Sequence, residues 1–198
     1  MLSADWGTFS EEEIKHRLRR QPGENPPSLE GFRSAAVLVP LLWEEDGWHL
    51  LFTRRTETVQ SHKGQVSFPG GTAEPGDITP EDTALREAYE EIGLLPRDAT
   101  IFGRLDHLAT VSNFLITPIL ARIPWPYPFH LSAEEVSHIF TIPLTWLADS
   151  SHWEERPRHL PSGKLENVVH YQPYGGETLW GISARITLEL LETLHRPG

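Results

Sequence analysis

The sequence contains no cysteine among its 198 residues. Disulfide bonds, thiolate metal sites and a cysteine nucleophile are therefore excluded. Basic residues are scarce as well, because 17 Lys and Arg stand against 28 Asp and Glu and leave a formal net charge of −11. Such a chain is not expected to bind nucleic acid or an anionic membrane through phosphate neutralisation. A small anionic substrate stays compatible with this charge if a local basic pocket or a metal ion holds it.

Long apolar runs are also missing. The longest, Ala35 to Trp43, contains Pro40 and is far shorter than the roughly 20 residues that cross a bilayer. Residues 1–13 are acidic and lack the basic start and apolar centre of a signal peptide. We therefore expect a cytoplasmic protein of one domain. The predicted division is an N-terminal helix and linker over residues 1–30 and a folded domain over residues 31–198.

Turn residues and apolar runs predict a mixture of helices and strands. Ser10 and Glu13 form a capping box that predicts a short helix through about Arg20. A closing helix is expected from Trp180 to His195, with a buried stripe of Ile182, Ile186, Leu190 and Leu194. The expected strands are 33–43, 48–54, 101–109 and 114–123. Because helices and strands do not alternate regularly, we predict a mixed sheet between helices, an α/β fold.

The segment from Thr79 to Leu94 predicts an amphipathic helix. Thr79 suits the N-cap, Pro80 suits the first turn and Gly93 suits the left-handed position at the end. The helical spacing of the apolar residues predicts a single buried stripe, which comprises Leu85, Ala88, Tyr89 and Ile92.

Three glutamates, Glu87, Glu90 and Glu91, are expected together on the opposite face of this helix. Like charges at this spacing cost about 0.2–0.5 kcal/mol per pair, and Arg86 offers a local counter-charge. The cluster is either a solvated acidic face or a site for a hard divalent cation, Mg²⁺ or Mn²⁺, which prefers oxygen ligands. The sequence just upstream favours the metal site.

Two adjacent glycines, Gly70 and Gly71, follow an apolar run upstream of the helix and let the backbone approach a ligand closely. A P-loop is excluded, because Asp77 and Ile78 stand where Lys and Ser or Thr are required. Gly71 and the run Arg86-Glu87-Ala88-Tyr89-Glu90-Glu91-Ile92-Gly93-Leu94 resemble the Nudix box, G-x5-E-x7-R-E-U-x-E-E-x-G-U with U apolar. The chain departs from that pattern in having Asp77 for the first Glu and one additional residue before Arg86.

This resemblance implies a Nudix-type α/β/α sandwich with a mixed β-sheet and a metal-dependent hydrolase of nucleoside diphosphates linked to another group. It implies Glu87 and Glu91 as the primary ligands of Mg²⁺ or Mn²⁺, followed by Glu90 and the carbonyl of Gly71. Arg86 is expected to orient Glu90 or a loop carboxylate.

The general base is left open between a box glutamate and a loop residue. Glu135 is the loop candidate for a catalytic role, and a salt bridge at a strand end is the alternative for its side chain.

A second pattern precedes the box and comprises Leu51-Phe52-Thr53-Arg54-Arg55-Thr56, then Gln60, then Gly64-Gln65-Val66-Ser67-Phe68-Pro69-Gly70-Gly71. It is similar to the signature of coenzyme A pyrophosphatases, which commonly have Ser or Ala at the position of Thr56 and Arg at that of Gln60. That subfamily also tolerates both departures from the box. The resemblance implies hydrolysis of coenzyme A, or of its oxidised or acylated forms, to 4′-phosphopantetheine and adenosine 3′,5′-bisphosphate.

The phosphates of such a substrate need local positive charge, which guanidinium groups supply well. Adjacent residues of a strand point to opposite faces, so we expect one of Arg54 and Arg55 to contact substrate. His62 is either a phosphate contact or a surface histidine. The predicted substrate-binding residues are Arg54, Arg55, His62, Lys63, Gly64, Gln65, Gly70 and Gly71.

Three alternatives compete with coenzyme A hydrolysis. Residues 124–129 resemble a Pro-Trp-Pro-Phe-Pro segment of NADH pyrophosphatases, but they lie about thirty residues beyond Gly93 and lack the leading Ser-Gln, which favours a structural role. ADP-ribose pyrophosphatases usually carry a proline after the box, and residues 108–114 contain none. A non-catalytic nucleotide-binding module would typically lose box glutamates, which this chain keeps. The expected partner is thus a small molecule, with no nucleic acid and no membrane, and the oligomeric state is not predicted.

Overall fold

The computed structural model of the chain describes residues 9–19, 31–45, 47–57, 64–159, 163 and 165–195. The predicted substrate contacts His62 and Lys63 lie outside these residues, as does the predicted linker from Gln21 to Glu30.

The secondary-structure elements follow the chain in the order α1 (Glu11–Arg19), β1 (Arg33–Glu44), β2 (Gly47–Arg55), β3 (Val66–Ser67), β4 (Gly70–Thr72), α2 (Pro80–Ile92), η1 (Pro96–Asp98), β5 (Thr100–Arg104), β6 (Leu108–Ala109), β7 (Phe114–Arg122), β8 (Val136–Pro143), α3 (Leu144–Leu147), η2 (Ser150–His152), β9 (Trp153–His159), β10 (Leu165–Tyr171) and α4 (Gly181–His195).

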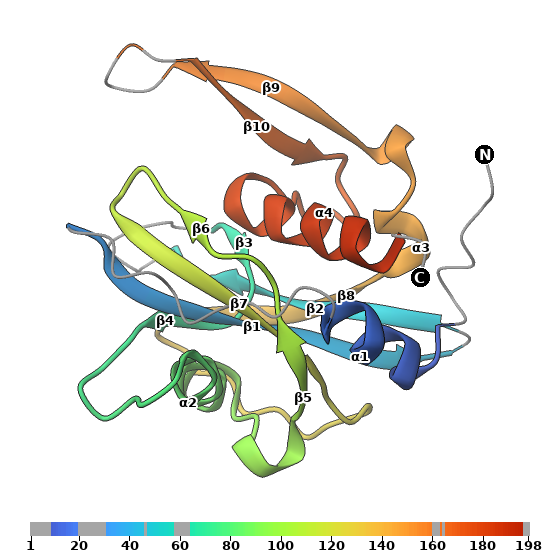
Figure 1. Cartoon of the computed structure of the whole chain (residues 1–198). Helices are drawn as coiled ribbons and strands as arrows, with labels where there is room; N and C mark the ends of the chain where they lie inside the picture. Colours follow the sequence, from blue (N-terminus) through green and yellow to red (C-terminus); the bar gives the residue numbers. More distant parts are fainter. Residues whose placement is uncertain are drawn as a thin grey trace.

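Strands β1 to β8 form one mixed sheet, which has β3-β2-β1-β7-β5 as its main path. Off this path, β4 pairs with β1, β6 pairs with β7 and β8 pairs with β2. β1 and β7 are parallel, and the other pairs of this sheet are antiparallel. Helix α2 covers one face of the sheet and α4 covers the other (Figure 1). The predicted α/β/α sandwich with a mixed β-sheet is therefore confirmed.

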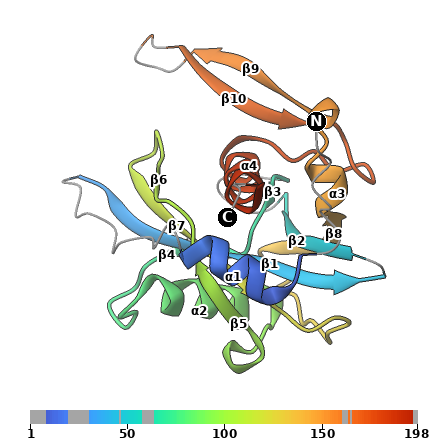
Figure 2. The same ribbon diagram turned by 45° about the vertical axis from the view of Figure 1, so that its right-hand side comes forward.

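The hairpin of β9 and β10 lies outside α4, on the side away from the sheet (Figures 1 and 2). The two strands are antiparallel, from Leu165 opposite His159 to Tyr171 opposite Trp153. This hairpin is not among the elements predicted from the sequence. Most of β9 is exposed, so the strand lacks the apolar alternation that marks a half-buried strand.

Strand β1 supplies residues to the hydrophobic clusters on both sides of the sheet. Leu38 and Leu42 pack on the α2 side, whereas Val39 and Leu41 pack on the α4 side. This division follows from the period-two alternation of side chains along a strand. The sheet is therefore buried on both faces, and it holds α2 in a fixed position.

Helix α1 begins at the predicted capping box. The backbone N–H of Ser10 donates to Glu13 Oε2 at 2.7 Å, and the N–H of Glu13 donates to Ser10 Oγ at 3.2 Å. Ile14 and Leu18 are buried and belong to the same hydrophobic cluster as α4. The N-terminal helix thus shares the core of the domain.

Helix α2 has the predicted ends. The hydroxyl of Thr79 accepts a hydrogen bond from the N–H of Asp82 at 3.2 Å, and the Asp82 carboxylate accepts one from the N–H of Thr79 at 2.8 Å. Gly93 ends the helix with φ of +71°, a conformation that glycine adopts without steric cost. The predicted N-cap, Pro80 in the first turn and left-handed glycine are all confirmed.

The buried stripe of α2 differs from the predicted one. Tyr89 is 52% exposed, while Ala84, Ala88 and Ile92 are buried, so the prediction for Tyr89 was wrong. The stripe is rotated because the small alanines pack against the sheet and leave the larger tyrosine outside. The same rotation buries Glu91, which is 2% exposed, so the prediction that all three glutamates lie on the face opposite the buried stripe was wrong for Glu91.

The apolar stripe of α4 is buried except at its first residue. Ile186, Leu190 and Leu194 are buried members of the cluster beneath the helix. Ile182 is 38% exposed, so its predicted burial was wrong; it lies in the first turn and does not join that cluster.

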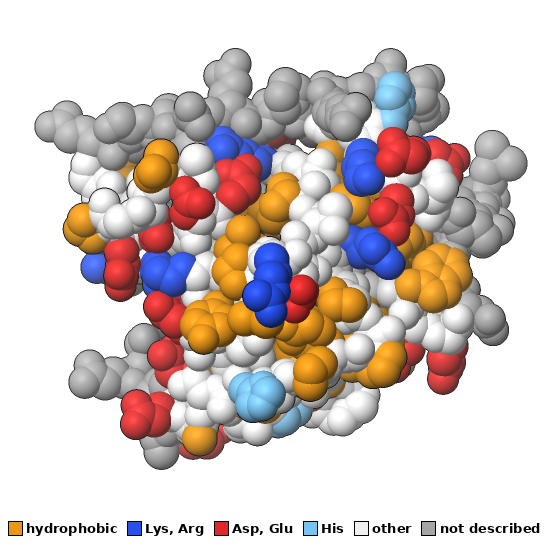
Figure 3. All heavy atoms as spheres, turned by 90° about the horizontal axis from the view of Figure 1, so that it is seen from below, with side chains coloured by type: hydrophobic (Ala, Val, Ile, Leu, Met, Phe, Trp, Pro, Cys, Tyr) orange, Lys and Arg blue, Asp and Glu red, His pale blue; other side chains and the backbone are white. Residues whose placement is uncertain are grey.

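Aromatic side chains of the proline-rich segment 124–129 pack against the α2 side of the core. Trp125, Tyr127 and Phe129 are partly buried there. The Tyr127 hydroxyl donates to Asp98 at 2.8 Å and accepts from the N–H of Leu95 at 3.2 Å. Figure 3, which views the molecule from the α2 side, shows hydrophobic side chains gathered on this face. These contacts support the structural role of the segment.

In the part of the chain that the structure describes, no helix has the length and apolar character needed to cross a membrane.

Candidate active site

Arg86 is the centre of a hydrogen-bond network on α2. Its Nη1 donates to Glu87 Oε1 at 2.9 Å and to Glu90 Oε2 at 3.0 Å. Its Nη2 also donates to the carbonyl of Thr72 at 3.0 Å. Arg86 therefore fixes two of the three box glutamates relative to the glycine loop, which is the arrangement of a positioning residue.

Asp77 anchors this network from the loop before α2. Its two carboxylate oxygens accept from Arg86 Nε at 3.2 Å and Nη2 at 3.0 Å, and it also accepts from the Thr83 hydroxyl and from the N–H of Glu74. The Arg86 hydrogen bonds lower the pKa of Asp77 to about 2, against the opposing effect of burial. Asp77 thus reaches the box arginine although it is shorter than Glu and lies one position further away.

Each of the two glycines of β4 lies so close to another group that a side chain would not fit. A Cβ on Gly70 would lie 2.5 Å from the carbonyl oxygen of Ala36 on β1. A Cβ on Gly71 would lie 2.5 Å from Glu87 Oε1. The first glycine lets β4 pack on the sheet, and the second makes room for the Glu87 carboxylate beside the backbone.

Glu91 is a buried carboxyl group among other charges. Burial raises its pKa to about 8, with contributions from Glu135 and Glu87, while Arg55 opposes the rise. Burial also raises the pKa of Glu87, although Arg86 acts in the opposite direction. Like charges and low solvent access both disfavour ionised carboxylates.

Arg55 and Glu135 reach Glu91 from outside α2. Arg55 Nη1 lies 3.4 Å from Glu91 Oε1, and Arg55 Nη2 lies 3.8 Å from Glu135 Oε2. The backbone N–H of Arg55 donates to the carbonyl of Gln65 at 3.0 Å, and that of Thr56 donates to the carbonyl of Glu135 at 2.9 Å. The end of β2, the glycine loop and the segment before β8 therefore meet at the buried end of the acidic cluster.

Arg54 makes its contacts elsewhere. Its Nη1 lies 2.6 Å from Glu177 Oε2 and its Nη2 lies 3.5 Å from Glu57, and His138 Nε2 lies 3.1 Å from the other oxygen of Glu177. A Cβ on Gly64 would lie 2.9 Å from Arg54 Nη2, so Gly64 belongs to this second cluster. The structure thus brings Arg55 to the box glutamates and pairs Arg54 with residues outside the box.

Two features of the site were not predicted: the pairing of Arg54 with Glu177 and His138, and the burial of Glu91. Arg54 and Glu177 are 123 positions apart, and no local pattern links them. Asp77 was noted as a departure from the box, and its position in the sequence was the signal for its contact with Arg86.

In the described residues, no three Asp, Glu or His side chains are gathered tightly enough to hold a metal ion as they stand. The donor set nevertheless fits a hard divalent cation. Around this site five carboxylates face the two guanidinium groups of Arg55 and Arg86. Burial and mutual repulsion raise the pKa values of Glu87 and Glu91, and a cation bound by oxygen ligands would relieve both.

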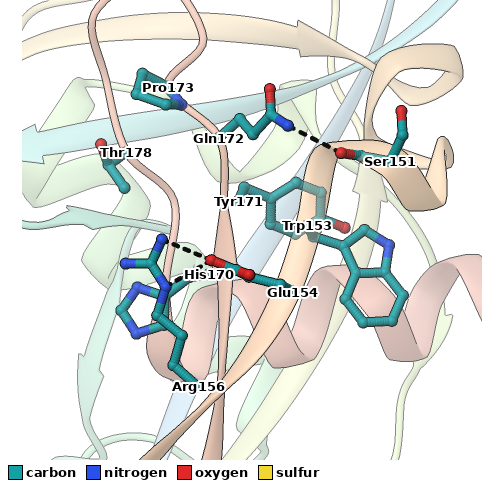
Figure 4. Close-up of a pocket in the computed structure, with 9 residues that line it drawn as sticks. All are labelled: Ser151, Trp153, Glu154, Arg156, His170, Tyr171, Gln172, Pro173 and Thr178. Carbon is teal, nitrogen blue, oxygen red and sulfur yellow. Dashed lines mark hydrogen bonds and ion pairs between the residues drawn. The ribbon is translucent and has the colours of Figure 1, made fainter.

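A pocket of about 390 Å³ lies at the β9–β10 hairpin, away from the box glutamates. The hairpin lies on the side of α4 away from the sheet (Figure 1), and Figure 4 shows the side chains that line the pocket. No predicted site residue lines it. Its lining residues are Ser151, Trp153, Glu154, Arg156, His170, Tyr171, Gln172, Pro173 and Thr178.

Comparisons with known proteins agree with this architecture. A family model described as the NUDIX domain matches residues 32–172. A protein of Yersinia enterocolitica named "Uncharacterized Nudix hydrolase NudL" is 35% identical over 195 residues, which cover 98% of this chain and 97% of that protein. A NudL protein of Yersinia pestis is 35% identical over 160 residues, covering 81% of this chain and 79% of its own.

Solved structures show the same fold. A MutT/nudix family protein from Enterococcus faecalis superposes with a TM-score of 0.55 at 15% identity, covering 93% of this chain and 74% of that one. A NUDIX hydrolase from Alicyclobacillus acidocaldarius gives a TM-score of 0.53 at 18% identity, covering 81% and 91%. At these identities the likeness concerns the fold alone.

Proposed function

The chain belongs to the Nudix hydrolases, which cleave pyrophosphate bonds in small molecules, and we propose that its substrate is coenzyme A or an oxidised or acylated form of it. Cleavage of the pyrophosphate would give 4′-phosphopantetheine and adenosine 3′,5′-bisphosphate.

One observation carries this proposal: the coenzyme A signature and the Nudix box share one site. The signature residue Arg55 contacts Glu91 of the box, at 3.4 Å, and its backbone pairs with Gln65 of the signature, at 3.0 Å. Gly71 closes the signature and lies against Glu87. The segment that suggests the substrate therefore adjoins the carboxylates that suggest the chemistry.

Nudix hydrolases generally use divalent metal ions, and we assign the ligands here to Glu87 and Glu91, with Glu90 and the Gly71 carbonyl next. When bound, Mg²⁺ or Mn²⁺ neutralises pyrophosphate oxygens and lowers the pKa of a coordinated water molecule.

The protein side chains supply positioning and charge. Arg86, held by Asp77, fixes Glu87 and Glu90 so that their geometry is set before substrate arrives. Arg55 is the signature guanidinium beside the carboxylates, and such a group binds phosphate oxygens well. We propose that a carboxylate of this site, either Glu135 or a box glutamate, takes the proton of the attacking water.

The test is a substrate panel. Coenzyme A, NADH and ADP-ribose are each incubated with the protein, with and without Mg²⁺ or Mn²⁺, and the phosphate-ester products are measured. We expect metal-dependent cleavage of coenzyme A at the highest kcat/KM. Faster cleavage of NADH or ADP-ribose would contradict the substrate assignment.

The Glu91→Gln variant tests the metal site independently of the substrate assignment. It keeps the size of the side chain but cannot ionise to bind a metal, so we expect a loss of turnover of at least about 100-fold with an unchanged circular dichroism spectrum. Retained activity would contradict the role of Glu91.

A further inference from the structure

Arg55 lies between two carboxylates but is held loosely. Its distances to Glu91 and Glu135 are 3.4 and 3.8 Å, longer than the usual 2.7–2.9 Å of a charge-assisted hydrogen bond. Arg86, by comparison, makes its bonds to Asp77, Glu87 and Glu90 at 2.9 to 3.2 Å. The two guanidinium groups of the site are thus held very differently.

The Nε of Arg55 is also buried without a hydrogen-bond partner. A buried donor without a partner costs free energy. Hydrogen bonding by Nε therefore does not stabilise Arg55 in this position. The side chain is 22% exposed, which leaves it a route toward solvent. What favours its position is the charge of the carboxylates next to it.

One of these two carboxylates, Glu91, is a ligand in the proposed metal site. The Glu91 side chain is 3% exposed, so water screens it little. Among the residues that the structure describes, Arg55 is the cation paired with it. A divalent ion on Glu91 and a guanidinium 3.4 Å from the same carboxylate would repel each other at short range in a poorly screened site.

We propose that Arg55 is the counter-ion of Glu91 in the metal-free enzyme and that it leaves this carboxylate when a divalent cation binds. Metal binding and the Arg55–Glu91 contact are then mutually exclusive, and Arg55 weakens the affinity of the site for metal. This inference rests on the proposed metal site, although not on the identity of the substrate.

The experiment measures Mg²⁺ binding to the whole protein by isothermal titration calorimetry, at pH 8.5 for every variant. Arg55→Met removes the charge and keeps an apolar stem of similar length. We expect the dissociation constant for Mg²⁺ to fall by about tenfold and the melting temperature in EDTA to fall as well. Arg54→Met is the matched control, because it lies on the same strand and pairs with Glu177, and it should leave Mg²⁺ affinity unchanged.

Arg55→Lys is the control for an effect of altered packing in Arg55→Met. Lysine keeps the positive charge, so we expect Mg²⁺ affinity close to that of the wild type. An unchanged or weaker affinity in Arg55→Met would overturn the inference, as would equal gains in both Arg55 variants.

Glu91→Gln shows whether a negative result contradicts only the counter-ion role of Arg55 or also the proposed metal site. If Arg55→Met has no effect while Glu91→Gln abolishes Mg²⁺ binding, the metal site stands and the counter-ion role is wrong. If Glu91→Gln binds Mg²⁺ as tightly as the wild type, both are wrong.

Discussion

Gly71 lies in β4 and Gly76 in the loop that follows this strand, and a methyl group added to each would meet different surroundings. At Gly71 it would lie 2.5 Å from Glu87 Oε1, whereas at Gly76 nothing lies within 4 Å. Gly71→Ala therefore has to displace the Glu87 carboxylate. Because a misplacement of about 1 Å can cost about 100-fold in rate, we expect kcat/KM to fall by about that factor with little change in melting temperature.

Gly76→Ala is the control for that measurement. It should retain the activity of the wild type, since its added methyl group meets no other atom. Equal activity of the two alanine variants would show that the space beside Gly71 does not matter for the reaction.

Asp77 offers a test of the anchor on Arg86. Asp77→Asn removes the charge that holds the guanidinium, and hydrogen bonds to charged groups contribute about 1.5–3 kcal/mol each. We expect the free energy of unfolding at pH 7, measured in urea, to fall by about 1–3 kcal/mol. Glu74→Gln, an exposed change in the same loop, should have no such effect.

The pH dependence of that loss has a defined sign. The folded-state pKa of Asp77 is lowered to about 2 from the usual 3.8, so the stabilisation is complete above the unfolded value and is lost as pH falls toward 2. The difference in stability between wild type and Asp77→Asn should therefore shrink between about pH 4 and pH 2. A difference that stays constant over this range would contradict the Arg86–Asp77 pairing.

Single residues of the site differ in how far the sequence predicts them. The contact of Arg86 with Glu90 was predictable because a spacing of four residues brings two side chains together on a helix. The contact of Arg86 with Glu87 was not predicted. The burial of Glu91 was not predictable, because an amphipathic pattern treats every glutamate as a solvent-facing residue. Arg54 and Arg55 were expected to point to opposite faces, but only the tertiary contacts of the folded chain show which of them reaches the box.

At the scale of elements, α4 carries an acid whose ionisation opposes folding. Glu189 accepts a hydrogen bond from the N–H of Asp106 at 2.6 Å. Burial raises its pKa to about 7, although the hydrogen bond from the Asp106 N–H lowers it. The charges of Asp106 and Glu192 add to the rise, and that of Arg185 opposes it. An acid with a raised folded-state pKa stabilises the protein at low pH, and this stabilisation is lost as pH rises through the folded value.

Glu189→Gln keeps the acceptor for Asp106 and cannot ionise. We expect it to unfold at the same denaturant concentration as the wild type at pH 5 and to be more stable at pH 8 by about 1–2 kcal/mol, a value reduced for the solvent that reaches the carboxyl group. Glu192→Gln, exposed on the same helix, should show no such pH dependence. A Glu189→Gln curve parallel to that of the wild type would contradict the raised pKa.

The predictability of elements follows the strength of local signals. Helix α2 was predicted with its true ends because an N-cap threonine, a proline in the first turn and a glycine suited to the left-handed position lie within the segment itself. The β9–β10 hairpin was missed, because β9 reads Trp-Glu-Glu-Arg-Pro-Arg-His and is largely exposed. Its position over α4 depends on tertiary contacts that no local pattern encodes.

For the whole molecule, the N-terminal helix raises a question of domain organisation. The sequence separates residues 1–30 from the domain, whereas the structure buries Ile14 completely in the main cluster. Ile14→Ala should lower the free energy of unfolding by about 2–4 kcal/mol, measured in urea with a single transition. Glu12→Ala, at a side chain that is 81% exposed, is the control.

A separate early transition for residues 9–19, with the main transition unchanged in Ile14→Ala, would contradict the shared core. The family model begins at residue 32, so this contact is a property that the box and the signature do not predict. The mixed sheet, in contrast, was predictable from the irregular order of helices and strands together with the box.

Both the proposed hydrolysis and the proposed role of Arg55 depend on the metal site of α2. Crystals of the protein soaked in Mn²⁺ provide a direct test, because the anomalous signal of manganese locates the ion without reference to activity. We predict an anomalous peak within bonding distance of the carboxylates of Glu87 and Glu91, with the Arg55 guanidinium moved away from Glu91. An anomalous map without a peak at these oxygens, and with Arg55 still beside Glu91, would contradict the account.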